Sequence, residues 1–322
     1  MSQAMGVYSE TRIYPETSLK TLPTAIKGYK IPFNSNTFSS SQNTTAPATI
    51  TGRRDAVQPI LGNVDTTGDL TIPLDLTATG YLLAAAFGKP TTSAGAGDPT
   101  GLYTHTFKAG KTQPSFTVEK AFSNGLYSII KGTKVNQLET SFGGDGELTL
   151  RAGLLGCDET ISKDPVTTTG ITEVSFNRLN NFQSSILIDG VESAVVTELS
   201  LTIAFGLDDS GYAIGSKGYR TRINEGLISP TGKLTAFFDD ESFVDRAINA
   251  TSTAIQIKLV NADGKQSLVI DLPEVQFARK TPSIDGTKGI TQELDFSAFY
   301  KAAEQGTCIQ FTLTNDTPSY DF

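Results

Sequence analysis

Hydrophobic and polar residues alternate along much of this chain. The alternation is clearest in four stretches, "GELTLRA" (146–152), "TELSLTIAF" (197–205), "AIQIKLV" (254–260) and "ITQELDFSAF" (290–299). Successive side chains of a strand point to opposite faces, so each stretch predicts a strand with one buried and one wet face. Such strands are typical of antiparallel sheets that cover a core on one side only.

Two segments have the spacing of a helix. The first covers residues 78–87, with Thr77 as the expected N-cap and Gly88 as the expected stop. The second covers residues 242–249 and follows Asp240. Both helices are short and come after a strand. We therefore predict a mainly β fold of the β-sandwich or β-barrel type, with a few short helices.

The strand-then-helix order is written twice. "GDLTIPLDLTATGYLLAAAFG" begins at Gly68 and "GKLTAFFDDESFVDRAINAT" begins at Gly232. Around both, the pattern reads strand, long loop, strand, helix and three further strands. This predicts two tandem β domains, at residues 24–156 and 183–300, each with one short helix. An N-terminal arm (1–23), a linker (157–182) and a C-terminal arm (301–322) complete the expected organisation.

The charge of the chain argues against tight binding to nucleic acid. The 322 residues carry a net charge of −8, and basic residues form no run. Binding to a polyanion needs clusters of Lys and Arg that neutralise phosphates. The N-terminus lacks the pattern of a secretory signal, and the longest apolar run, near "YLLAAAF", is too short to cross a bilayer. We expect a protein made in the cytoplasm and not associated with a membrane.

Residues that could carry chemistry are few. His105 is the single histidine, and Cys157 and Cys308 are too few for a zinc site or a disulfide framework. We expect His105 to be a strand residue and the cysteines to be small buried thiols. The acidic pairs in "GLDDSG" and "FFDDES" lack the spacing of a calcium loop, and "GGDG" (143–146) has no P-loop lysine. The sequence predicts no enzyme activity, no cofactor and no bound metal, and a hairpin turn at "GGDG".

Four stretches resemble the tail tube proteins of long-tailed bacteriophages. They are "TGDLTIPLDLTATGYLLAAAFG", "KGTKVNQLETSFGGDGELTLRAGLLG", "ISPTGKLTAFFDD" and "LVIDLPEVQFARKTPSIDGTKGITQELDFSAFY". The resemblance implies a β-sandwich flanked by a helix. It also implies rings of six such units, whose inner sheets join into one wall, and stacking of the rings into a tube that DNA passes through.

With two domains in each chain, the resemblance implies a trimeric ring with pseudo-sixfold symmetry. A hexamer with one tube domain and one ornament per chain stays open. The implied partners are further copies of the chain, the tape measure protein and the tail-tip and terminator proteins. DNA would pass through the lumen without specific binding, in a virion tail assembled in the host cytoplasm.

Two groups of residues are candidates for these roles. The polar rows of the alternating strands are expected to face the lumen, at Glu147, Thr149, Glu293 and Asp295. Two polar stretches at matching places in the two halves, 34–50 and 206–219, are expected to be ring-stacking loops, through Asn34, Phe38, Asn43, Asp208 and Tyr212. The strand expected within 307–315 could pair with an adjacent subunit or within its own chain.

Other functions fit the same composition. A minor tail protein, a tail terminator or a capsid decoration protein would also be a β-rich virion protein. A carbohydrate-binding adhesive module is a third class of function.

Overall fold

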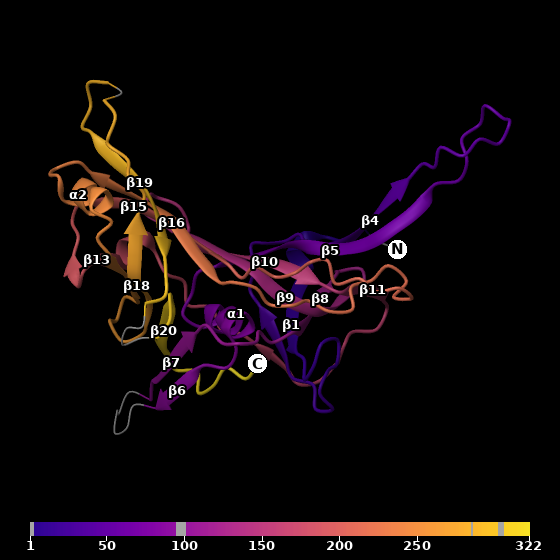
Figure 1. Ribbon diagram of the computed structural model, residues 1–322. Helices are drawn as coiled ribbons and strands as arrows, with labels where there is room; N and C mark the ends of the chain where they lie inside the picture. Colours follow the sequence, from indigo (N-terminus) through magenta and orange to yellow (C-terminus); the bar gives the residue numbers. More distant parts are fainter. Residues whose placement is uncertain (1–2, 95–100, 285, 302–305) are drawn as a thin grey trace.

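The computed structural model describes residues 3–94, 101–284, 286–301 and 306–322 (Figure 1). Its strands are β1 (Glu10–Pro15), β2 (Gly28–Ile31), β3 (Ser35–Asn36), β4 (Ser39–Thr45), β5 (Ile60–Pro73), β6 (Thr91–Ala94), β7 (Tyr103–Lys108), β8 (Phe116–Ala121), β9 (Tyr127–Phe142), β10 (Thr149–Gly156), β11 (Asp158–Ser162), β12 (Ile171–Glu173), β13 (Ser184–Ile188), β14 (Val191–Glu192), β15 (Val196–Ala204), β16 (Ser229–Phe237), β17 (Thr253–Val260), β18 (Ser267–Phe277), β19 (Thr291–Ala298) and β20 (Gln310–Asn315). The helices are α1 (Ala78–Phe87) and α2 (Ser242–Ile248), with short 3₁₀ turns at Gly6–Tyr8 and Asn181–Gln183. The predicted mainly β class is confirmed, and the sheet does not close on itself.

In the first half of the chain, the long strand β9 belongs to two layers. One layer runs β2–β1–β8–β9, with β11 on the other side of β9. The other layer runs β4–β5–β10–β9. The turn between β9 and β10 contains the "GGDG" segment, as predicted. Helix α1 lies beneath the second layer in Figure 1.

The second half repeats this order of pairing. Strands β15, β16, β19 and β18 pair as β4, β5, β10 and β9 do. The order β13–β17–β18 matches the order β1–β8–β9, because β13 pairs with β17 and β17 pairs with β18. Strand β20 pairs with β18 in the place that β11 takes beside β9. The strand registers also agree. Leu70 of β5 corresponds to Leu234 of β16, and each lies opposite a buried residue of the next strand, Ala152 of β10 and Leu294 of β19.

A strand pairing joins the two halves into one sheet. The C-terminal part of β9 pairs with β15, with Leu138 opposite Ile203 and Phe142 opposite Leu199. The order β4–β5–β10–β9–β15–β16–β19–β18 is therefore continuous across the molecule. Alternate residues of these strands are buried, as the alternation in the sequence predicts.

Helix α1 is buried on all sides. Each of its residues is buried, so it packs as a core element and not as a surface helix. Its close approach to the C-terminal segment requires Gly80, because a Cβ at this position would lie 2.2 Å from Cζ of Tyr320. The Tyr320 hydroxyl donates to the carbonyl oxygen of Thr77 at 3.1 Å. The last residues of the chain thus anchor α1.

The start of α1 differs from the prediction that Thr77 caps it. The Thr77 side chain makes no cap hydrogen bond, whereas Asp75 Oδ1 accepts the backbone N–H groups of Thr77 and Thr79, each at 3.0 Å. Asp75 is completely buried, and its Oδ2 has no hydrogen-bond partner among the described residues. Burial raises the pKa of Asp75 to about 6, against the lowering effect of these backbone hydrogen bonds. Gly88 ends the helix at φ 89°, as predicted.

Each of the two segments predicted as terminal arms contains a strand that packs within its own chain. Strand β1 pairs with β2 and β8, and β20 pairs with β18 and β7 of the same chain. Burial explains the difference, because Ile13 and Tyr14 of β1 and Leu313 of β20 are core residues. For the C-terminal strand, the structure therefore shows the within-chain alternative.

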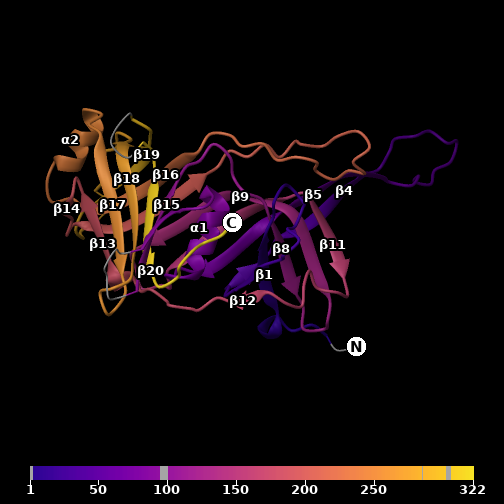
Figure 2. The same cartoon turned by 90° about the horizontal axis from the view of Figure 1, so that it is seen from below.

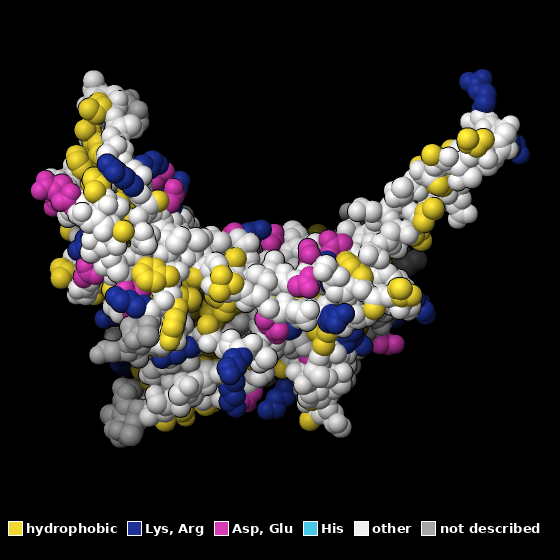
Figure 3. All heavy atoms as spheres, viewed as in Figure 1, with side chains coloured by type: hydrophobic (Ala, Val, Ile, Leu, Met, Phe, Trp, Pro, Cys, Tyr) yellow, Lys and Arg dark blue, Asp and Glu magenta, His cyan; other side chains and the backbone are white. Residues whose placement is uncertain are grey.

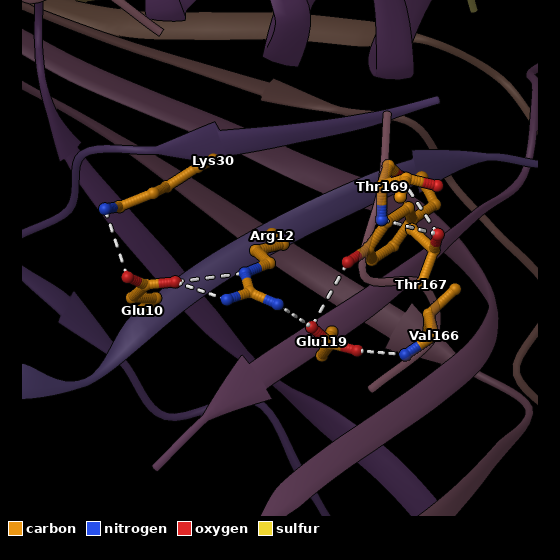
Figure 4. Close-up of polar contacts among 8 residues, drawn as sticks. Glu10, Arg12, Lys30, Glu119, Val166, Thr167 and Thr169 are labelled. Carbon is orange, nitrogen blue, oxygen red and sulfur yellow. Dashed lines mark hydrogen bonds and ion pairs between the residues drawn. The ribbon is translucent and has the colours of Figure 1, made fainter. Parts of the chain in front are cut away.

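The segment predicted as a linker also packs against the first half. Strand β11 pairs with β9, and β12 runs parallel to β2. Figure 4 shows the polar contacts that hold the segment between them. Glu119 is completely buried, accepts from Arg12 Nη1 at 2.8 Å and from the Val166 N–H at 2.5 Å, and thereby ties residue 166 to β8. Arg12 also pairs with Glu10, which in turn pairs with Lys30.

Two connections at corresponding places have different conformations. Residues 46–59 join β4 to β5 and form the tip of an arm that projects from the body (Figure 1). Residues 205–228 join β15 to β16 and run along the first half toward the base of this arm (Figure 2). The stretch 34–50, expected to be a long exposed loop or arm, contains the short strand β3 and the strand β4, which pairs with β5 and leads into the arm.

Candidate functional site

One face of the continuous sheet is polar. On the strands from β5 to β19, the residues that alternate with the buried ones are partly or fully exposed and lie opposite one another across the strands. We call this surface the polar face and define it by Asp69, Thr71, Gln137, Glu139, Ser141, Thr149, Arg151, Ser200, Thr202, Thr231, Lys233, Thr235, Glu293, Asp295 and Ser297. Threonine and serine are common on it, and charged residues of both signs lie among them.

In the first half, the charged residues of the polar face centre on Arg151. Its Nη2 lies 2.9 Å from Asp69 Oδ2, and its Nη1 pairs with Glu139. The hydrogen bonds to Glu139 and Asp69 raise the pKa of Arg151. Arg151 thus pairs with a carboxylate on each of the two neighbouring strands, β5 and β9. Its charge is matched locally.

In the second half, the charged residues centre on Glu293. Its Oε1 lies 2.8 Å from Lys280 Nζ and 3.1 Å from Lys233 Nζ. The hydrogen bond from Lys280, followed by that from Lys233, lowers the pKa of Glu293. Asp295 is exposed on the same strand and lies directly opposite Lys233. Here too, acidic and basic groups lie close together in partial exposure.

Glu147 lies at the start of β10 and contacts a residue from the other predicted group. Its carboxylate accepts a hydrogen bond from Asn34 Nδ2 at 2.7 Å and pairs with Arg178 at 3.1 Å. Thr149 is half-buried on β10, next to the strand β5. Thus Glu147, predicted for the lumen, and Asn34, predicted for stacking, are neighbours at one end of the sheet.

The polar face is hollowed over the second half. A depression of about 740 Å³ is lined by residues of β15, β16, β18 and β19, including Ser200, Thr231, Lys233 and Asp295. Figure 3 shows acidic and basic side chains side by side along the upper side of the body, between the arm and the projection near β19. The polar face is thus concave over the second half and carries charges of both signs there.

The other predicted stacking residues lie in different environments. Phe38 is completely buried, so the prediction that it lies in an exposed loop is wrong, because its ring belongs to the core of the first half. Asn43 is exposed on the arm. Tyr212 donates a hydrogen bond to the carbonyl oxygen of Val64, and Asp208 accepts one from the Ser210 N–H. The stacking role of these loops stays a prediction.

The histidine and the two cysteines considered for chemistry are buried within the fold. His105 is buried in β7, with Nδ1 2.9 Å from the Thr92 hydroxyl and Nε2 2.8 Å from the Thr317 carbonyl oxygen. Burial lowers the pKa of His105. Cys157 and Cys308 are buried and free, as predicted. Among the described residues, no group of acidic, His and Cys side chains could hold a metal ion.

The comparison with known protein families agrees with this architecture. The family model of the phage tail tube protein matches residues 9–298, which cover most of the chain. The chain belongs to the phage tail tube protein family. A search among curated proteins found no match.

Membership of this family decides among the functions that the composition left open. The chain is a structural protein of the virion and forms the tail tube, and the comparisons give no support to the minor-protein, decoration or adhesive alternatives. The family is a structural one and not an enzyme family. None of the helices in the described part of the chain is long and apolar enough to cross a membrane.

Several residues of the polar face were not singled out from the sequence. Asp69, Glu139 and Lys233 come from three different strands, and with Lys280 of the connection between β18 and β19 they complete the charge pairs of Arg151 and Glu293. Alternation within a strand shows which face a residue is on. It does not show which strands are neighbours, and the charge pairs depend on that.

Proposed function

We propose that this tail tube protein forms a trimeric ring in which each chain supplies two equivalent units of the tube wall. The observation that supports this proposal is the pairing of β9 with β15, which places two four-strand units of the same order side by side in one sheet. A unit that joins its twin through a strand edge can join a unit of another chain in the same way.

The geometry of such a ring is compatible with a DNA conduit. Six units of four strands, spaced about 4.7 Å apart and tilted by about 40°, close a barrel on the order of 45 Å across. This leaves a bore wider than a DNA duplex. Closure would also remove the exposed strand edges that favour aggregation.

The polar face is the proposed lining of the bore. Its acidic and basic groups neutralise one another, at Arg151 with Asp69 and Glu139, and at Glu293 with Lys233 and Lys280. DNA carries about one negative charge per 1.7 Å, so a basic lining would hold it. A lining with paired charges and many hydroxyl groups lets DNA pass without specific binding.

Assembly would take place in the host cytoplasm, with stacked rings, the tape measure protein and the tail-tip and terminator proteins as partners. Residues 34–50 and 206–219 remain the proposed stacking segments, apart from the buried Phe38.

The mass of the ring tests the proposal. Purified protein should form rings of three chains of 34.3 kDa each, and tubes at higher concentration, seen by native mass spectrometry and negative-stain microscopy. Gold-labelled Asp295→Cys tubes should carry the label inside the bore. Rings of six chains would reject the two-unit arrangement, and label on the outer surface would reject the lining.

A further inference from the structure

The connection between β15 and β16 covers a surface of the first half. Ile223 of this connection is 4% exposed and packs against Leu155 and Cys157 at the end of β10. Arg220 is also buried, donates to the Gly156 carbonyl oxygen at 3.0 Å and pairs with Asp65 of β5. One apolar and one basic side chain from residues 205–228 therefore cover the end of β10 and the adjoining part of β5.

Among the described residues, the corresponding surface of the second half has no such cover. Thr67 lies opposite Leu155 and Thr231 lies opposite Ser297, so β19 ends where β10 does, and the start of β16 corresponds to Asp65 within β5. A groove of about 610 Å³ lies at this place, and Pro230, Ala298, Phe299 and Tyr300 are among the residues that line it. Its wall includes exposed aromatic side chains, since Phe299 is 37% and Tyr300 is 63% exposed.

The arm of the first half is the counterpart of the connection that closes the first surface. Residues 46–59 and 205–228 link corresponding pairs of strands, and together with the adjoining ends of β4 and β5 the arm covers residues 42–64. Each carries two arginines ahead of apolar residues: Arg53 and Arg54 on the arm, Arg220 and Arg222 on the connection. On the arm, the apolar side chains of Ile50, Ile60 and Leu61 are exposed, Leu61 by 65%.

We propose that the arm of one chain binds in the groove of a second copy of this chain. Ile60 and Leu61 would cover Phe299 and Tyr300 as Ile223 covers Leu155 and Cys157. Arg53 and Arg54 would donate to carbonyl oxygens at the ends of β16 and β19, as Arg220 does at Gly156. The inference rests on the proposed ring of equivalent units. It assigns the arm, including residues 42–50, to the contact that joins one chain to the next within a ring, in place of a stacking role for those residues.

The direction of the two connections supports a contact within one ring. Residues 205–228 extend from the second half over the first half, and the arm extends onward from the first half, away from the second (Figure 2). Each chain therefore presents an arm that projects from the first half and a groove at the ends of β16 and β19 in the second half. Such a head-to-tail contact closes into a ring when the rotation between copies allows it.

Two substitutions with a matched control test this contact. Leu61→Asp alters the arm and Tyr300→Asp alters the groove, whereas Val191→Asp alters an apolar side chain on β14 that is 70% exposed. All three variants should fold with unchanged thermal midpoints, because the side chains lie at the surface. We expect the first two to need about tenfold or more protein for half-assembly, and Val191→Asp to assemble as the original chain does.

Mixing the two defective variants makes the test specific. Leu61→Asp keeps an intact groove and Tyr300→Asp keeps an intact arm, so a mixture should stop at a dimer of one of each, seen by sedimentation velocity. If both variants assemble normally while the original chain forms rings, the arm–groove contact is rejected and the ring stands. If the original chain forms no rings at all, the proposed function fails. Dimers in the mixture would still support the contact.

Discussion

Arg151 and Glu293 occupy corresponding positions in the two halves and carry opposite charges. Arg151 lies opposite Thr71 and pairs with Asp69, whereas Glu293 lies opposite Thr235 and pairs with Lys233. Asp69 and Lys233 correspond as well, so the charges of the whole pair are exchanged. An ion pair is kept at this place on the polar face, whichever strand carries the positive group.

This exchange predicts that the first pair can be reversed. Asp69→Lys and Arg151→Glu should each lower the free energy of unfolding by about 0.5–1 kcal/mol, because each leaves like charges adjacent. The double variant should recover the part of the loss that comes from residues 69 and 151, as measured by urea unfolding, whereas Glu139 still faces a like charge at position 151. Additive losses in the double variant would show that the two side chains do not interact across the strands.

The buried carboxyl of Asp75 should make stability depend on pH. Its pKa is about 6 in the folded chain and near 3.8 in the unfolded chain. Between these values the folded state binds more protons, so the free energy of unfolding falls as pH rises from about 4 to about 6, by roughly 3 kcal/mol.

Asp75→Asn isolates this effect from other titrating groups. Carboxyl groups with lowered pKa, such as Glu159, lose their contribution as pH falls, which gives a slope of opposite sign. The difference between the original chain and the variant, measured by urea unfolding at several pH values, should therefore show only the loss due to Asp75. Equal pH profiles for the two proteins would contradict the prediction.

The ion pair between Arg12 and Glu119 should contribute strongly to the stability of the first half. Arg12→Met leaves a completely buried carboxylate without its cation, and should lower the free energy of unfolding by about 3–5 kcal/mol. Arg53→Met is the matched control, since Arg53 is exposed on the arm, and it should change stability by less than about 0.5 kcal/mol. Similar midpoints of chemical unfolding for both variants would refute this role.

The fit of α1 against the end of the chain should not tolerate a larger residue at Gly80. Gly80→Ala introduces a Cβ against the Tyr320 ring and should cost about 1–3 kcal/mol. Gly146→Ala is a suitable control, because no atom lies within 4 Å of its added Cβ. Thermal unfolding followed by circular dichroism compares the two. A shift of the midpoint in the control alone would indicate a different arrangement of the C-terminus.

Local patterns predicted the strands and helices well. The alternation at 197–205 and 290–299 indicated the buried faces of β15 and β19, and the segment from Thr77 to Gly88 gave the length of α1. Burial on one face of a strand leaves a period in the sequence. A helix end leaves a glycine, here with φ near 89°.

Features that depend on distant contacts were harder to predict. Phe38 lies in a stretch rich in Ser, Thr and Asn, which predicted an exposed polar segment, yet it is a core residue. Its backbone packs directly against Gly68, where a Cβ would lie 2.6 Å from the Cα of Phe38. The charge pairs of the polar face and the pairing of β20 with β7 likewise join residues far apart in the chain. None of these contacts has a local signature.

The junction between β9 and β15 also bears on how this wall could evolve. A ring made of identical single units has only one kind of interface between units (a seam), so a substitution there alters every interface of the ring. Fusing two units gives a ring two kinds of seam, one formed as the chain folds and one formed when chains meet. The first needs no encounter between molecules and can diverge freely from the second. The symmetry of such a ring is threefold and not sixfold. A neighbouring tail protein with threefold symmetry would therefore have defined orientations in which to bind it.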